Sequence, residues 1–208
     1  SAASDVYKRQ AYNASAGAHD VTLTVNGEVL TKTLTVLPKD FGTAEVEAEP
    51  APTEAANTEF RNSIWPLYEQ PAQEKLWSGG FVCPAEDYLV LLDFGQIKIT
   101  NGQQGSKSNS TKLYTIPGDP ARAPANGTVA FAGNLALTGS TVVIDHGAGL
   151  RSIFYGLTAL DVEAGDDVKQ GQLLGTSGRT VVAELRIGTV PINPLLVWRG
   201  QCDGLKYY

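Results

Sequence analysis

One stretch of the chain, residues 118–175, constrains the fold more than any other. Short runs of β-branched residues alternate there with Gly, Asn-Gly and Asp-Asp turns, a pattern typical of antiparallel strands joined by tight reversals. No helix of ordinary length fits between these turn signals, so the sequence predicts an all-β core. An apolar run at residues 88–94, Y-L-V-L-L-D-F, predicts a further, buried strand. Within the core, strands are expected at residues 128–131, 141–145, 150–155 and 172–176.

The order of motifs in this core resembles that of the M23 peptidases, the LytM/lysostaphin-type zinc endopeptidases of bacterial cell walls. Three pieces carry the resemblance in order: A-P-A-N-G-T-V, V-V-I-D-H-G-A-G-L and V-E-A-G-D-D-V-K-Q-G-Q-L-L-G. It covers residues 77–198 and includes F-G at 94–95 and P-I-N-P at 191–194. The resemblance implies an all-β, M23/LytM-like antiparallel sheet of the duplicated-hybrid-motif type.

The zinc ligands of that family are missing from this chain. A zinc hydrolase needs about three His or carboxylate ligands and an open position for water, which the family draws from H-x-x-x-D and H-x-H segments. Here the first segment reads S-N-S-T-K-L, with Lys112 or Leu113 at the ligating Asp, and H-L-H-F-E is replaced by T-V-V-A-E. Gly156 stands where the family has a further His that helps stabilise the transition state. The resemblance therefore implies a pseudoenzyme with no catalytic residue, no metal and no other cofactor.

The chain has two histidines and two cysteines to account for. His146 lies in I-D-H-G, a position that the family has but does not use for metal, and His19 is expected at the surface. Cys83 and Cys202 stand near the two ends of the M23-like region, where an exported protein would carry a disulfide. Two unpaired thiols are the alternative. A zinc site or a Cys-His nucleophile pair built from these residues has no supporting spacing.

The chain divides into four predicted segments. Residues 1–37 hold two alternating runs joined by Asn-Gly, a hairpin signal; this hairpin is either the remnant of an Ig-like module or packs on the later domain. Residues 38–58 are rich in Ala, Glu, Pro and Thr, which predicts an extended or disordered acidic linker. Residues 59–76 are expected to form an aromatic docking arm, and residues 77–208 the M23/LytM-like domain.

Charge and hydropathy exclude two classes of function. With 16 Lys and Arg against 22 Asp and Glu, the net charge is −6, and without a basic cluster nucleic-acid binding is not expected. No apolar run reaches the length of a membrane span, and the first ten residues lack the apolar region of a signal peptide. The family resemblance implies an extracytoplasmic protein, secreted or cell-surface, so we expect that a signal or anchor was removed from this sequence.

The resemblance implies a non-catalytic module that binds peptidoglycan or a cell-wall hydrolase partner. Lys112 and Arg179 would bind a peptide carboxylate by charge-assisted hydrogen bonds. Two alternatives stay open, a structural domain of a cell-surface or spore protein and a zinc endopeptidase with unrecognised ligands. A biotinyl or lipoyl carrier shares part of the pattern, but Lys169 is not at the acceptor tip. The residues expected near the vestigial groove are Lys112, Tyr155, Arg179 and Glu184.

Overall fold

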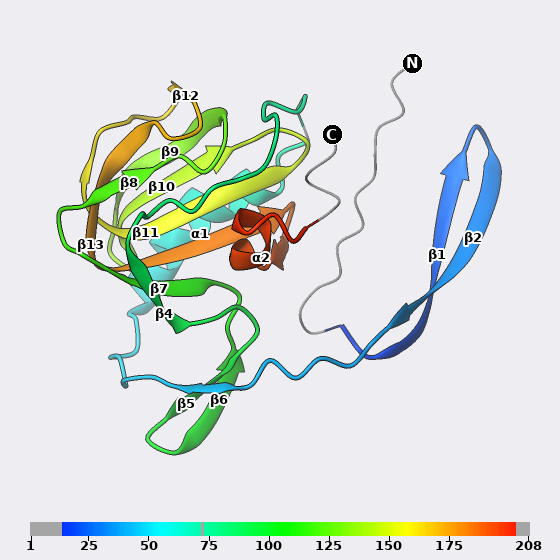
Figure 1. The fold of residues 1–208 in the computed structure, drawn as a ribbon, viewed down its shortest axis with the longest axis horizontal. Helices are drawn as coiled ribbons and strands as arrows, with labels where there is room; N and C mark the ends of the chain where they lie inside the picture. Colours follow the sequence, from blue (N-terminus) through cyan, green and yellow to red (C-terminus); the bar gives the residue numbers. More distant parts are fainter. Residues whose placement is uncertain (1–13, 72, 203–208) are drawn as a thin grey trace.

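The computed structural model describes residues 14–71 and 73–202 of the chain (Figure 1). Its main body is a nine-stranded sheet with the order β12-β9-β10-β11-β13-β7-β4, in which β8 and β14 pair additionally with β13. Every strand pair of this sheet is antiparallel, which confirms the predicted fold class. The strands are β4 (Tyr88–Leu92), β7 (Thr111–Thr115), β8 (Pro120–Arg122), β9 (Gly127–Leu135), β10 (Gly139–Asp145), β11 (Leu150–Leu160), β12 (Asp167–Val168), β13 (Leu173–Ile187) and β14 (Val190–Ile192).

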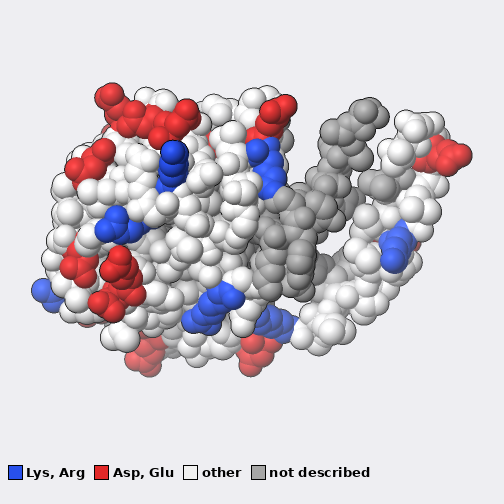
Figure 2. All heavy atoms as spheres, turned by 45° about the horizontal axis from the view of Figure 1, so that its top comes forward, with Lys and Arg blue, Asp and Glu red and all other residues white. Residues whose placement is uncertain are grey.

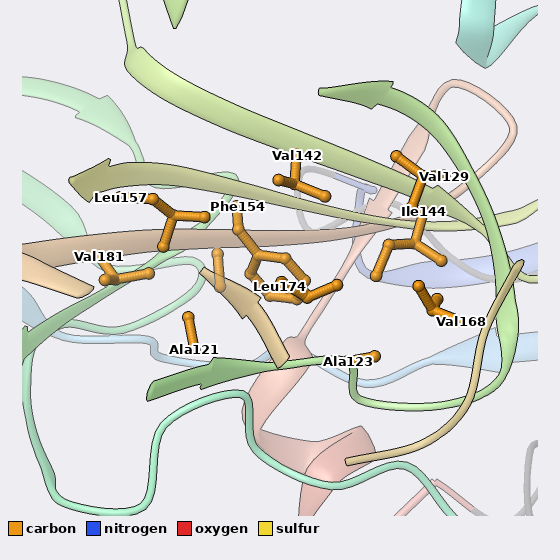
Figure 3. Close-up of a cluster of buried hydrophobic side chains, with 11 residues drawn as sticks. Ala121, Ala123, Val129, Val142, Ile144, Phe154, Leu157, Val168, Leu174 and Val181 are labelled. Atoms are coloured by element: carbon orange, nitrogen blue, oxygen red, sulfur yellow. The ribbon is translucent and has the colours of Figure 1, made fainter. Parts of the chain in front are cut away.

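The sheet separates two layers of side chains, because successive residues of a strand point to opposite faces. On β13, Val181, Ala183 and Leu185 are buried on one face, which we call the inner face. At one end of it lies the main core cluster (Figure 3). At the other end, the short helix α2 (Pro194–Trp198) packs on a second cluster with Trp77 and Phe81. The main cluster consists of Ala121, Ala123, Val129, Val142, Ile144, Phe154, Leu157, Val168, Leu174, Val181 and Ala183.

The opposite, outer face of the sheet is covered by helix α1 (Glu54–Tyr68) (Figure 1). The helix begins where Thr53 caps it, its side chain accepting a hydrogen bond from the Ala56 amide at 3.2 Å, and such a cap satisfies an amide that the helix leaves open. Ile64 and Tyr68 are buried against the sheet. The helix thus starts inside the stretch 38–58, which was predicted to be an extended or disordered linker. One N-cap and a few apolar side chains are enough to stabilise a helix when those side chains pack on a sheet.

The rest of the predicted linker is ordered as well. Its strand β3 (Thr43–Glu45) pairs in parallel with β5 (Ile97–Thr100), and β5 pairs with β6 (Gln103–Lys107) to complete a three-stranded sheet. Next to β3, the Phe41 ring has the ammonium groups of Lys39 and Lys107 at 4.9 and 5.6 Å from its centroid. Backbone pairing and cation–π contacts therefore hold a segment whose composition alone suggested disorder.

The predicted N-terminal hairpin forms from β1 (Gly17–Val25) and β2 (Glu28–Val36) and projects away from the main body (Figure 1). Its turn residues Asn26 and Gly27 have φ of 50° and 84°, as a two-residue hairpin turn requires. The predicted hairpin is formed, and both interpretations of it, an Ig-like remnant or a hairpin that packs on the later domain, stay predictions.

The apolar run at residues 88–94 forms a strand, but the prediction that this strand is buried is wrong. β4 lies at the edge of the sheet and pairs only with β7. Leu89 and Leu91 are 68 % and 46 % exposed, whereas Leu92 and Phe94 are buried. A strand at the edge of a sheet has no neighbouring strand on one side. The hydropathy of the sequence does not show whether a strand lies at the edge or in the middle of the sheet.

The surface carries both signs of charge. Lys and Arg side chains are interspersed with Asp and Glu over the face in Figure 2, and no part of that face is predominantly basic. Among the described helices, neither is long and apolar enough to cross a membrane.

Substitution at Gly147 should destabilise the fold more than substitution at a comparable glycine. Both Gly147 and Gly171 have a left-handed backbone, φ 78° and 81°, which costs a non-glycine residue about 1 kcal/mol. A Cβ at Gly147 would also overlap the carbonyl of Glu74, whereas one at Gly171 meets nothing within 4 Å. Gly147→Ala is therefore expected to lose roughly 1–3 kcal/mol more than Gly171→Ala in urea unfolding. Equal losses of stability in the two variants would show that the backbone around Glu74 can move aside without cost.

Candidate functional site

The residues aligned with the family's metal ligands meet on the outer face. Lys112 of β7 and Tyr155 of β11 are both register partners of Val182 on β13, and register partners point to the same face of a sheet. Glu184 lies two residues after Val182, hence on that face too. Three of the four residues predicted near the vestigial groove are therefore brought together: Lys112, Tyr155 and Glu184.

A chain of buried polar contacts runs along this face. The Tyr155 hydroxyl donates to Glu184 Oε1 at 2.9 Å, and the Arg186 Nε donates to Glu184 Oε2 at 2.7 Å. The Arg186 guanidinium lies 4.6 Å from the centroid of the Tyr68 ring, and its Nη1 donates to the Thr189 carbonyl at 2.9 Å. Each carboxylate oxygen of the buried Glu184 thus has a donor, as a charge in a low-dielectric site requires.

The electrostatics of this cluster keep both tyrosines neutral. Burial, and next the nearby Glu184 carboxylate, raise the pKa of Tyr68 to about 12. The same two causes raise the pKa of Tyr155 well above its ordinary value. Burial by itself lowers the pKa of Arg186, but the attraction of Glu184 outweighs it and the net shift is upward. The cluster is therefore a network of buried hydrogen bonds in which both tyrosine hydroxyls stay protonated near neutral pH.

Helix α1 covers the cluster of Tyr155 and Glu184 on the outer face of the sheet. The Phe60 ring packs edge-on against Tyr155 with centroids 6.1 Å apart, and Ile64 and Tyr68 complete the contact. Tyr155 and Glu184 are each only 7 % exposed as a result. The face of the sheet that carries Tyr155 and Glu184 is thus covered by this chain's own helix.

Lys112 lies at the edge of this cluster, and the fourth predicted residue, Arg179, lies apart from it. Lys112 forms an ion pair with Glu49 at 3.0 Å, which holds the segment before α1 against β7. Arg179 is exposed, and in the described part of the chain no hydrogen bond or ion pair joins it to Lys112, Tyr155 or Glu184. The structure therefore separates Arg179 from the other three.

Two residues of the cluster, Tyr68 and Arg186, were missed by sequence reasoning. Arg186 could have been found, because it follows Glu184 by two residues on a strand and therefore shares its face. Tyr68 carried no such signal, since its place depends on how α1 docks.

The described residues contain no group of three or more His, Cys, Asp or Glu side chains that could hold a metal ion. Lys112 and Val182, at two aligned ligand positions, offer no neutral imidazole or carboxylate. Gly156, aligned with the transition-state His, has φ 78°, and a Cβ there would overlap the Thr180 carbonyl oxygen. The backbone itself therefore leaves no room for a side chain at that position.

His146 has a structural place under the inner face. Its Nδ1 is 2.7 Å from the Asn126 carbonyl, its Nε2 is 2.8 Å from the Ser152 hydroxyl, and the Phe81 ring packs edge-on at 5.0 Å. Complete burial lowers the pKa of His146 to about 4. A neutral imidazole held on both nitrogens by the protein is a core residue.

Cys83 and Cys202 are not joined by a disulfide in the structure. Both are half-buried, Cys83 beside the Tyr88 side chain and Cys202 against the second core cluster. The two sulfur atoms have different neighbours. The structure therefore does not contain the predicted disulfide between Cys83 and Cys202, and the pairing stays a prediction.

The fold and these aligned positions define a domain of the LytM/lysostaphin type. Residues 106–194 match the family model of Peptidase family M23. The chain carries a domain of that family and, by the residues at the ligand positions, is a degenerate member that lacks the zinc ligands.

Three curated relatives match the same domain. The chain is 34% identical over 82 residues to Stage II sporulation protein Q of Bacillus subtilis, covering 35% of this chain and 29% of that protein. It is 32% identical over 77 residues to cell division protein DipM of Caulobacter vibrioides, with coverages of 36% and 13%. It is 33% identical over 92 residues to DD-carboxypeptidase/endopeptidase Mpg of Neisseria meningitidis, with coverages of 40% and 21%. The chain thus spans less than a third of the length of these relatives.

Solved structures show the same fold. A Pseudomonas aeruginosa protein described as a peptidase M23 superposes with a TM-score of 0.65 at 18% identity, covering 89% of this chain and 74% of that one. The solution structure of lysostaphin gives a TM-score of 0.51 at 18% identity, with coverages of 59% and 55%. At this identity the likeness establishes the fold and not the activity.

Removing the Tyr155 hydroxyl should destabilise the protein. Tyr155→Phe leaves Glu184 Oε1 buried without its donor, which costs about 1–3 kcal/mol. Tyr114→Phe is the matched control, because Tyr114 lies on the same face but is exposed, and a change within about 0.5 kcal/mol is expected there. Chemical unfolding of both variants measures the difference. Equal losses would mean that the Tyr155–Glu184 bond contributes nothing specific.

Stability should fall in acid because of His146. Its pKa is 6.5 before folding and about 4 in the folded protein, so the unfolded chain binds a proton in this range that the folded protein does not. Its contribution is therefore complete above pH 6.5 and is lost as the pH falls toward about 4, by roughly 3 kcal/mol in all. Urea unfolding across this range should show a flatter pH slope for His146→Gln, whereas the hairpin variant His19→Gln should keep the parent slope. An unchanged pH slope in His146→Gln would mean that groups other than His146 cause the loss of stability in acid.

Proposed function

We propose that this protein is a non-catalytic, exported M23-like module that binds a cell-wall hydrolase and regulates it, or binds peptidoglycan, without cleaving the wall itself. The observation that carries the proposal is the state of the groove. Its aligned ligand positions hold Lys112 and Val182, and α1 covers the face on which they lie. A domain that keeps the scaffold but fills the reaction site can act through binding alone.

Of the two partners, the structure favours a protein. A peptidoglycan peptide would need the groove, which Phe60, Ile64 and Tyr68 of α1 occupy. Of the predicted binding residues, Tyr155 and Glu184 hold this helix in place, and Lys112 and Arg179 stay accessible. These two cations are the predicted binding residues that a peptide carboxylate can still reach. The similarity to proteins named for sporulation, for cell division and for carboxypeptidase/endopeptidase activity supports the proposed role in the cell wall.

Zinc content and wall cleavage test the loss of catalysis. The purified protein, incubated with zinc and then desalted, is expected to hold far less than one equivalent of metal and to release no peptide from isolated sacculi. An active M23 endopeptidase treated in parallel is the positive control. Stoichiometric zinc together with cleavage would make the chain an enzyme and overturn the proposal.

Two binding assays separate the partners. If the chain regulates a hydrolase, it should change the rate at which a wall hydrolase degrades labelled sacculi while it does not itself sediment with them. If it binds the wall, it should sediment with sacculi, and the variant Lys112→Ala/Arg179→Ala should sediment less than the parent, with Lys98→Ala/Arg61→Ala as the charge-matched control. If the protein neither sediments with sacculi nor changes the hydrolase rate, the proposed function is wrong and a structural role replaces it.

A further inference from the structure

The strand β4 forms one open edge of the main sheet. Within the described chain its only ladder partner is β7, and no backbone hydrogen bond joins residues 88–92 to any other segment. The amides and carbonyls on its outer side therefore remain available to another strand. Natural sheets protect such edges with charges, prolines or a covering loop.

The protection at this edge is incomplete. Residues 88–92 contain no charge and no proline, and Leu89, Val90 and Leu91 are exposed. Leu89 is the register partner of Tyr114, another exposed side chain, so the two form one apolar surface on the outer face beyond the reach of α1. A register shift between Val90 and Leu92 bends the strand but leaves Leu89 and Leu91 in solvent.

Acidic side chains stand at both ends of this apolar edge. Asp87 precedes the strand and is exposed, and Asp93 follows it and is half-buried. Glu86 adds a third carboxylate, partly offset by Arg122 at 3.5 Å. At about 3.3 Å per residue, Asp87 and Asp93 are roughly 20 Å apart.

This charge pattern selects the occupant. If two copies of the chain paired their β4 strands antiparallel about Val90, Asp87 of each copy would face Asp93 of the other, and like charges directly opposite are destabilising. A strand with a basic residue at each end would instead place one cation opposite each carboxylate. Electrostatic complementarity therefore favours a different chain of opposite end charge.

We propose that β4 is a docking edge for an extended segment of a partner protein, apolar at alternate positions and flanked by Lys or Arg, which adds to the sheet as a further strand. This deepens the proposed function, on which it rests, by naming how the partner is recognised. Backbone hydrogen bonds supply the generic part of the affinity, and the exposed surface of Leu89 and Tyr114, together with Leu91 at the register shift, contacts the apolar side chains of the partner strand.

A short designed peptide tests the edge directly. The probe is Lys-Val-Thr-Val-Thr-Val-Lys, acetylated and amidated so that only its lysines carry charge, with binding to the full chain followed by amide NMR shifts. We expect saturable shifts at residues 88–92 and 112–116. A peptide with Glu in place of both Lys, and one N-methylated at every second residue on the bonded edge, should each bind at least about tenfold more weakly. Equal binding of the N-methylated peptide, or no shift with the parent peptide at millimolar concentration, would overturn the proposal.

Matched variants locate the site. Leu89→Lys and Leu91→Lys should each weaken binding about tenfold, while Leu137→Lys, at an exposed leucine between β9 and β10, should not. All three positions are exposed, so thermal unfolding is expected to be unchanged and a folding defect would be visible. Sedimentation that shows a dimer lost on Leu89→Lys would replace the partner strand with a second copy and overturn the proposal. These measurements do not involve zinc, wall cleavage or hydrolase rates. A negative result here would therefore overturn the docking edge without deciding the proposed function.

Discussion

The buried carboxylate of Glu184 is the interaction on which the outer face of this protein depends. A charge at that depth is tolerated only where it is fully hydrogen-bonded, and the donors come from Tyr155 on one strand and Arg186 on its own strand. Arg186 in turn packs on Tyr68 of α1. One ionised group therefore connects strand to strand and sheet to helix, and the helix that it helps to hold is the element that covers the groove.

The differences between this site and a zinc-binding M23 site lie at three levels of structure. The ligating side chains are replaced, with Lys112 and Val182 at two of the positions. The backbone at Gly156 has closed against Thr180, so a histidine there would need a different strand path. The open face has been filled by aromatic and aliphatic side chains of α1. Restoring a zinc site would therefore require changes in side chains, in backbone and in packing together.

The sequence predicted the parts of the fold that depend on local pattern. Asn26-Gly27 specified the hairpin, and the Gly and Asp-Asp turns specified the antiparallel core, because turn geometry is set by a few neighbouring residues. What it could not predict depends on long-range partners. Residues 38–58 have the composition of a linker, yet β3 gains a strand partner and Thr53 starts a helix. Hydropathy marked residues 88–94 as a strand but could not say that this strand is the last in the sheet.

The same distinction applies to the site. Lys112, Tyr155 and Glu184 were placed together by alignment to a family whose sheet register is shared, and the register holds. Arg179 was placed by the same alignment but lies just before Thr180, in a part of β13 where the pairing with β11 is irregular. A one-residue irregularity in a ladder changes the face to which a side chain points. Alignment therefore locates residues in regular ladders better than those beside a bulge.

The short segment between β3 and α1 links two elements that would otherwise open independently. β3 is hydrogen-bonded to β5, Glu49 forms an ion pair with Lys112, and the helix begins five residues after Glu49. Local opening in proteins occurs in contiguous cooperative units. Because one short segment joins β3 to α1 and is itself ion-paired with the main sheet at Lys112, we expect the small sheet and the start of the helix to open together.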